Sequence, residues 1–207
     1  TELYTPGAGF KDAGNMVTPR FYAVAAPLPN GQVLYAGGFD ASFLNQVAGA
    51  EIYDPFWAGV GPMNEGRSSH SSTLLVDGRV LLAGGGDGMG AARGSAELFD
   101  PATMSFTRVA MQGAREKHSA TLLTSGDVLL TGGQNGTGHF LSASEIFNPA
   151  ANNFSGTAAL SVPRLDHTAT LLSDGRVLVT GGFSPTPQRT TEFFSWNAVS
   201  RQGTFAA

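Results

Sequence analysis

The sequence predicts an all-β protein made of four similar units, each with four short antiparallel strands, preceded by half a unit. An arginine recurs at intervals of 47, 48 and 49 residues, and a Gly-Gly doublet follows each arginine by 17 residues. A turn with glycine at its second position lies between each arginine and its doublet. No stretch of ten residues is free of Gly, Pro and β-branched residues, which argues against helices. The arginines are Arg20, Arg67, Arg115 and Arg164, and the doublets begin at Gly37, Gly84, Gly132 and Gly181.

The first two strands of each unit are predicted to form a hairpin. In the second unit, residues 67–76 lead into Asp77-Gly78, and the apolar segment Val80–Ala83 follows directly. Glycine tolerates the positive φ of such a tight turn. The apolar segment does not alternate with polar residues, as expected for a strand that is covered on both faces. The equivalent turns are Asn30-Gly31, Ser125-Gly126 and Asp174-Gly175.

A second turn joins the third and fourth strands. In the second unit the third strand is predicted at residues 96–99, and Asp100-Pro101 suits the first two positions of a type I turn. The fourth strand then holds Phe106, and the next unit has Phe154 at this place. Four short antiparallel strands in a repeat of about 40 to 50 residues are typical of a β-propeller, in which each repeat forms one sheet, or blade.

Three segments of the repeat resemble the core motif of bacterial kelch-repeat proteins. One is H-S-S-T-L-L-V-D-G-R-V-L-L-A-G-G at residues 70–85, and the others lie at 118–133 and 167–182. The resemblance extends from Met16 to about Trp196. It implies a kelch-type β-propeller fold and says almost nothing about function. The first unit departs from the motif, because Ala23 stands where the other units have histidine.

The start of the chain matches only the third and fourth strands of a further unit. We therefore expect residues 1–207 to form a single β-propeller domain, or a fragment of one, with four complete four-stranded blades and a leading two-stranded half blade. The half blade covers residues 1–15, and the repeats cover about 16–62, 63–110, 111–159 and 160–207. Either a longer parent chain was trimmed, which we favour, or another chain completes the first sheet.

Composition excludes several classes of protein. A chain of 207 residues is long enough for one domain. The net charge of −4, with dispersed arginines and lysines, predicts no nucleic-acid partner. No apolar stretch approaches the roughly 20 residues that span a membrane. The absence of cysteine excludes disulfides and thiolate metal sites. A chain rich in Gly, Ser and Thr and poor in lysine favours a secreted or extracellular location.

The polar residues that recur once per unit are expected to be structural, because a catalytic residue is needed only once. We predict that the arginines pair with recurring glutamates within or between blades, which fixes strand register. Three histidines recur as well, each three residues after an arginine. We expect them to lie apart, and so predict no catalytic residue, no cofactor and no metal. The glutamates are Glu51, Glu97, Glu145 and Glu192, and the histidines are His70, His118 and His167.

Function is expected to depend on the residues that do not repeat. The connections between second and third strands (B–C) and between units (D–A) lie on one face and vary in sequence. Their mixture of rings, amides and charges is typical of ligand and protein contact surfaces. The alternative is a set of solvated loops with Phe43 or Phe183 packed onto the body. The candidate ligand-binding residues are Asp40, Trp57, Asp87, Arg93, Gln134, Asn135, His139 and Arg189.

Three functions are consistent with the sequence. The leading hypothesis is a non-catalytic recognition or scaffold module that binds a protein or glycan through the B–C/D–A loop face. A structural subunit that self-associates through its incomplete blade is an alternative. The third is a sugar-processing enzyme, because the resemblance to kelch propellers extends to some oxidases and sugar-processing enzymes. Copper-radical oxidases of that kind need a cysteine joined to a tyrosine, and this chain has no cysteine.

Overall fold

The structure is a computed structural model that describes residues 1–42 and 45–207. All regular elements in these residues are strands, which confirms the all-β prediction. Phe43, one of the two phenylalanines considered for packing onto the body, lies outside the described residues. Within the described ranges, no helix is long and apolar enough to cross a membrane.

Four antiparallel sheets contain four strands each, in chain order, and are named sheets 1 to 4. Sheet 1 contains β3 (Val24–Pro27), β4 (Val33–Ala36), β5 (Ala50–Tyr53) and β6 (Trp57–Val60). Sheet 2 contains β7 (Ser71–Leu74), β8 (Val80–Ala83), β9 (Ser95–Asp100) and β10 (Ser105–Ala110). Sheet 3 contains β11 (Ser119–Leu122), β12 (Val128–Thr131), β13 (Ser144–Asn148) and β14 (Asn153–Thr157). Sheet 4 contains β15 (Thr168–Leu171), β16 (Val177–Thr180), β19 (Thr191–Asn197) and β20 (Gln202–Ala206).

Two smaller sheets have two strands each. β1 (Glu2–Thr5) and β2 (Gly9–Asp12) pair antiparallel at the start of the chain, and we call them the N-terminal hairpin. β17 (Phe183–Ser184) and β18 (Thr186–Pro187) form a short hairpin between the second and third strands of sheet 4. This insertion makes the B–C connection of sheet 4 differ from the corresponding loops of the other sheets.

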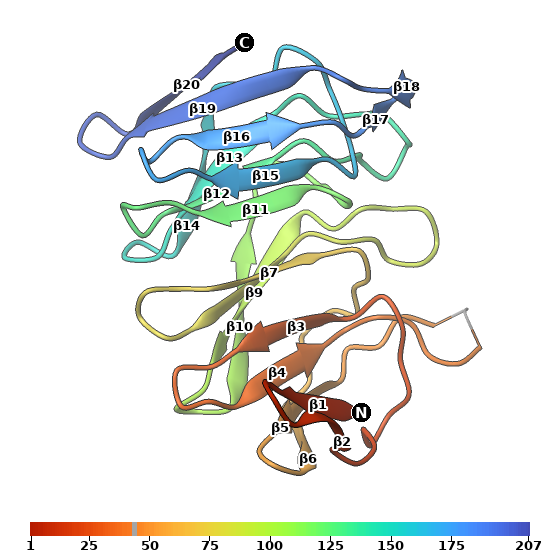
Figure 1. Cartoon of the computed structure of the whole chain (residues 1–207). Coiled ribbons are helices and arrows are strands. Elements are labelled where there is room, and N and C mark those ends of the chain that lie inside the picture. The colour runs from red at the N-terminus through yellow and green to blue at the C-terminus, as the bar shows by residue number, and fades with distance from the viewer. Residues whose placement is uncertain (43–44) are drawn as a thin grey trace.

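The sheets follow one another as layers from the N-terminal hairpin to sheet 4, and the two termini lie at opposite ends of the stack (Figure 1). The first strands of consecutive sheets, β3, β7, β11 and β15, are in contact. The connections between sheets and the B–C loops lie together on the right of Figure 1, and we call this side the loop end. The turns between first and second strands and between third and fourth strands lie on the left, at the turn end.

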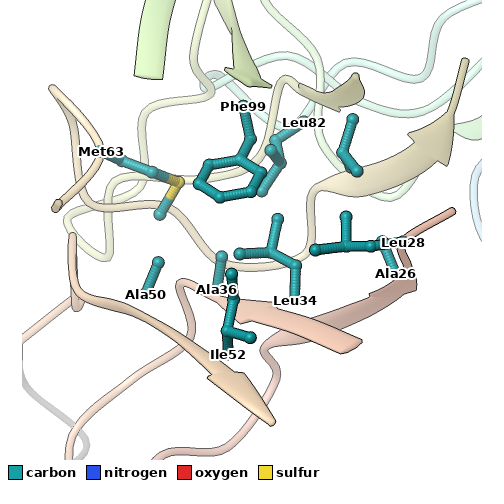
Figure 2. Close-up of a cluster of buried hydrophobic side chains, with 10 residues drawn as sticks. Ala26, Leu28, Leu34, Ala36, Ala50, Ile52, Met63, Leu82 and Phe99 are labelled. Carbon is teal, nitrogen blue, oxygen red and sulfur yellow. The ribbon is translucent and has the colours of Figure 1, made fainter. Parts of the chain in front are cut away.

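Apolar side chains fill the space between consecutive sheets. Leu34 of β4, Leu82 of β8 and Phe99 of β9 belong to one cluster between sheets 1 and 2 (Figure 2). The neighbouring residue Leu81 packs instead into the cluster between sheets 2 and 3. Because successive residues of a strand point to opposite faces, β8 is buried on both sides, and its sequence does not alternate. Each fully buried Leu or Phe contributes about 1.5–3 kcal/mol relative to an exposed one.

The Gly-Gly doublets lie where each sheet is in close contact with the next. The amide of Gly85 donates a hydrogen bond to the carbonyl of Arg115 in the next sheet, at 2.8 Å. A Cβ on Gly84 would meet the same carbonyl and the ring of His118. The same contacts join sheet 1 to sheet 2 and sheet 3 to sheet 4. The doublet is therefore required by the close approach of the next sheet as well as by its positive φ.

Candidate functional site

The recurring arginines and glutamates form buried ion pairs within each sheet. Arg67 lies 3.0 Å from Glu97, and both side chains are 0 % exposed. The guanidinium of Arg67 also donates to the carbonyls of Gly84 and Ser95, at 2.7 and 2.9 Å. Burial lowers the pKa of Arg67, and Glu97 opposes that shift. The equivalent pairs are Arg20–Glu51 at 2.6 Å, Arg115–Glu145 at 2.8 Å and Arg164–Glu192 at 3.0 Å.

The recurring histidines lie on the boundaries between sheets. His118 Nε2 is hydrogen-bonded to Ser71 Oγ of the preceding sheet at 2.9 Å, and His167 Nε2 to Ser119 Oγ at the same distance. Among the residues that the structure describes, neither ring nitrogen of His70 has a hydrogen-bond partner. The residue that corresponds to Ser71 one repeat earlier is Val24, which has no polar group to offer.

These histidines are neutral at pH 7. Burial, followed by the charge of Arg67, lowers the pKa of His70 to about 3. Burial also lowers the pKa of His167 to about 4 and that of His118 well below its ordinary value. In the part of the chain that the structure describes, no three His, Asp or Glu side chains are grouped so that they could hold a metal ion.

A cavity of about 780 Å³ opens at the loop end, and all four sheets contribute to its lining. Its wall includes the short segment that follows each recurring arginine and enters the first strand. It also includes the B–C loop of sheet 2. The lining residues other than the recurring histidines are Tyr22, Phe39, Ser68, Ser69, Gly86, Asp87, Gly88, Gly90, Ala91, Glu116, Lys117 and Asp166.

Four of these residues occupy equivalent places, two residues after each recurring arginine, and share a left-handed backbone. Tyr22, Ser69, Lys117 and Asp166 have φ values of 54°, 52°, 54° and 50°. Each such non-glycine residue costs on the order of 1 kcal/mol or more. The amide of Lys117 donates to the carbonyl of Ser69, and that of Asp166 to the carbonyl of Lys117, both at 3.1 Å. We call these residues the mouth residues.

Carboxylates outnumber cations around the cavity. Asp87 accepts backbone hydrogen bonds from Ala91 and Met89, which lower its pKa and keep it ionised. Glu116 accepts a hydrogen bond from Gln134 Nε2 at 2.7 Å. Asp166 adds a third carboxylate. Lys117 is the one lysine or arginine among the described residues that line this cavity.

The structure brings two of the predicted binding residues to the cavity. Asp87 lines it, and Gln134 holds the lining residue Glu116. Two others organise their own loops instead. Asp40 Oδ1 accepts a hydrogen bond from the amide of Ser42 at 3.0 Å, and Asn135 Oδ1 accepts one from the amide of His139 at 3.1 Å.

Three further candidates lie at the loop end but outside the cavity wall. The guanidinium of Arg93 donates to the carbonyl of Gly66, so this side chain is held by a hydrogen bond within the protein. His139 is exposed, and its Nδ1 is hydrogen-bonded to Thr137 Oγ1 at 2.8 Å. Arg189 is exposed on the connection after β18.

Trp57 lies at the turn end, so its prediction as a loop-face residue is wrong. The turn after β5 is short, with the amide of Asp54 donating to the carbonyl of Phe56 at 3.0 Å, and Trp57 is already the first residue of β6. Trp57 pairs across the sheet with Tyr53. Its Nε1 donates to Thr1 Oγ1 of the N-terminal hairpin region at 3.1 Å.

The mouth residues were missed by the sequence prediction, although a signal for them exists. The arginine recurs in every unit and the histidine directly after this place in three of them, whereas the two residues between arginine and histidine differ in every unit. A position that varies inside an otherwise regular repeat is a candidate for recognition. The prediction sought such variation in the B–C and D–A connections.

Comparison with known proteins gives one informative match. No protein-family model matches the chain. The chain is similar to an F-box/kelch-repeat protein of Arabidopsis thaliana, with 36 % identity over 95 residues. The aligned part covers 43 % of this chain and 23 % of that relative, so the chain spans under a quarter of the curated protein it matches. Because the relative is a plant protein, the match gives no support to a bacterial source. The match and the repeated four-stranded sheets together support a relationship to kelch-repeat proteins.

Proposed function

We propose that this chain is a non-catalytic module that recognises a protein partner through the cavity at the loop end. The observation that carries the proposal is the convergence of all four sheets on one cavity of about 780 Å³, with a non-repeating residue from each sheet at its mouth. Ligand sites are typically concave, with few and well-placed polar groups. We infer that the four sheets are successive blades of a β-propeller, with the cavity near its axis.

Two further features support recognition of a protein. The lining mixes aromatic, hydroxyl, amine and carboxylate groups, which suits a charged peptide segment better than a neutral glycan. The left-handed backbone of the mouth residues is a local strain that the neighbouring hydrogen bonds maintain, and such strain is concentrated at functional sites. The similar plant protein is a kelch-repeat protein by name, and this similarity suggests a protein-interaction module.

The test compares two sets of variants in a protein-binding screen. Tyr22→Asn, Lys117→Asn and Asp166→Asn together alter the mouth while keeping residues that tolerate a left-handed backbone. Phe56→Ser and Val76→Ser together alter exposed apolar residues at the turn end, where Phe56 is 79 % and Val76 73 % exposed. We expect partners of the wild-type chain to be lost by the first set and kept by the second. The reverse pattern would contradict the proposal.

A second function is favoured by a specific observation at the N-terminal hairpin. A cavity of about 360 Å³ lies between this hairpin and sheet 1, lined by Leu3 of β1 and the rings of Tyr35, Tyr53 and Trp57. β1 pairs with β2 on one side only. An unpaired strand edge beside an apolar floor is suited to the addition of a strand from another chain.

We infer from this geometry a structural subunit that self-associates through β1. The expected result is a mass in solution that rises with concentration and returns to that of the monomer in Leu3→Asp. Phe56→Ser, at the turn end of sheet 1, is the matched control and should leave the mass unchanged. A wild-type chain that stays monomeric at all concentrations would contradict this second function.

A further inference from the structure

We propose that the loop-end cavity binds a cationic side chain, arginine in preference to lysine, carried by a segment of the partner protein. This inference rests on the proposed recognition function and gives the chemistry of its ligand. It depends on the charge balance of the cavity and on an exposed ring at its mouth.

The charge balance favours a cation. Asp87, Glu116 and Asp166 line the cavity together with one cation, Lys117, so the wall carries an excess of two negative charges. None of these groups forms an ion pair within the described part of the chain. The charge of Arg93, which lies outside the cavity wall, contributes to lowering the pKa of Asp87 without forming an ion pair with it. A cationic ligand would meet a complementary potential in this partly enclosed site.

The ring of Tyr22 supplies a flat surface at the mouth. Tyr22 is 70 % exposed although it is a large aromatic residue. Its ring meets Phe21 edge-on, and Phe21 stacks on Phe39, which also lines the cavity. The ring of Tyr22 is thus supported by Phe21, which is itself stacked on Phe39, while much of the ring stays accessible. A planar guanidinium stacks on such a ring better than an ammonium group does, which favours arginine.

The wall of the cavity includes a buried histidine, His70, which is 6 % exposed. Its two ring nitrogens are buried and have no hydrogen-bond partner among the described residues. The ring lies against Gly37 of sheet 1, where Val24 stands at the place of the hydroxyl that His118 uses. The missing bond therefore belongs to the boundary between sheets 1 and 2, and the preference for a cation rests on the charge balance and on the ring of Tyr22.

The mouth positions allow the charge to be changed without disturbing the backbone. Lys117 and Asp166 are exposed and have left-handed φ values that asparagine tolerates better than most residues do. Asp166→Asn removes one negative charge, and Lys117→Asn removes the opposing positive charge. If the cavity binds a cation, the two variants should change affinity in opposite directions.

The experiment measures binding of short peptides to the full chain by calorimetry and by NMR shifts. The probes are a peptide with two arginines, the same peptide with lysine, with the neutral isostere citrulline, and with glutamate. We expect the arginine peptide to bind about tenfold more tightly than the citrulline peptide, and the lysine peptide to lie between them. Added salt should weaken the arginine complex.

Single substitutions then test whether the peptide binds at the mouth of the cavity. Asp166→Asn should weaken arginine binding about fivefold and Lys117→Asn should strengthen it by a similar factor, as for partly exposed charge pairs. Asp174→Asn, at the turn end, makes the same change of net charge and should have no effect. Equal affinities for arginine and citrulline, tighter binding of glutamate, or unchanged affinity in both mouth variants would overturn the inference.

The same variants separate this inference from the proposed function. A protein partner that is lost by the triple mouth variant, yet binds Asp166→Asn and Lys117→Asn as well as wild type, would overturn the cation preference and leave recognition at the loop end standing. A partner that is indifferent to the triple mouth variant would overturn both.

Discussion

His118 is hydrogen-bonded through Nε2 to Ser71 Oγ at 2.9 Å, across the boundary between sheets 2 and 3. The same bond joins His167 to Ser119 across the next boundary. Because a histidine from one repeat meets a hydroxyl from the repeat before it, the Arg-x-x-His-Ser motif links neighbouring sheets as well as building its own. At the boundary between sheets 1 and 2, Val24 stands at the place of the hydroxyl, and His70 has no hydrogen-bond partner in the described ranges.

The first prediction concerns this missing hydroxyl. Val24→Thr keeps the branched side chain and places a hydroxyl where Ser71 has one, so it should raise the free energy of unfolding by about 1 kcal/mol. Urea denaturation gives the measurement. Val24→Ala is the control, because it removes methyl groups without offering a partner, and it should lower stability. If the Thr variant is no more stable than the Ala variant, His70 does not use position 24 as His118 uses Ser71.

The second prediction is a loss of stability between pH 6.5 and about 4. The folded-state pKa of His70 is lowered to about 3 and that of His167 to about 4, from an ordinary value of 6.5. Below pH 6.5 the unfolded chain binds protons that the folded chain does not, so stability is full above this pH and declines below it. Each such histidine contributes about 1.4 kcal/mol per pH unit.

Denaturation curves at several pH values check this window. His167→Gln should reduce the slope by about one proton. Carboxylates such as Asp87, whose pKa is lowered from 3.8, affect stability only at lower pH. Constant stability from pH 6.5 to 4.5 would contradict the prediction.

The third prediction separates a buried ion pair from an exposed one. Arg115 and Glu145 lie 2.8 Å apart and are almost fully buried. Glu145→Ala leaves an unpaired buried guanidinium and should cost about 3–5 kcal/mol. Asp174→Ala breaks the pair with Arg176, in which the side chains are 48 % and 47 % exposed, and should cost less than 1 kcal/mol. Thermal unfolding of both variants gives the comparison, and similar losses would show that burial is not the cause.

The fourth prediction uses two equivalent glycines. Gly132 and Gly181 have positive φ values of 65° and 69°. A Cβ on Gly132 would lie 2.5 Å from the carbonyl of Arg164 in the next sheet, whereas one on Gly181 would meet nothing nearer than the carbonyl of Gln188 at 3.9 Å. The backbone cost of alanine, about 1 kcal/mol, is common to both.

Gly132→Ala should therefore lower the free energy of unfolding by at least about 2 kcal/mol more than Gly181→Ala does, because overpacking is added to the backbone cost. The two variants differ only in whether a following sheet abuts the glycine. Equal losses would mean that the close contact between sheets is relieved at little cost.

The local elements were predictable because their signals are local. The turn at Asp77-Gly78 and the apolar strand from Val80 to Ala83 are set by the φ preference of glycine and by burial on both faces. Trp57 was misplaced because a strand that contains Gly59 resembles a loop in sequence. Its pairing with Tyr53 depends on the third strand, which fixes where the fourth begins.

The cavity mouth was not predictable from residue type. Tyr, Ser, Lys and Asp have little in common, yet Tyr22, Ser69, Lys117 and Asp166 share a left-handed backbone. The bond between His118 and Ser71 is likewise a property of how two repeats meet, which spacing within one repeat does not contain. The repeat could be predicted from the sequence, whereas the contacts between successive repeats are seen only in the structure.

The contacts at the Gly-Gly doublets couple the unfolding of neighbouring sheets. At each boundary, a glycine amide of one sheet donates to an arginine carbonyl of the next, and a histidine of the next sheet packs on the doublet. The free energy of unfolding of one sheet therefore depends in part on its neighbours, as in a one-dimensional cooperative array. Sheets 2 and 3 have four-stranded neighbours on both sides, so their amides should exchange with deuterium most slowly. The N-terminal hairpin, whose residues are almost all exposed, should exchange first.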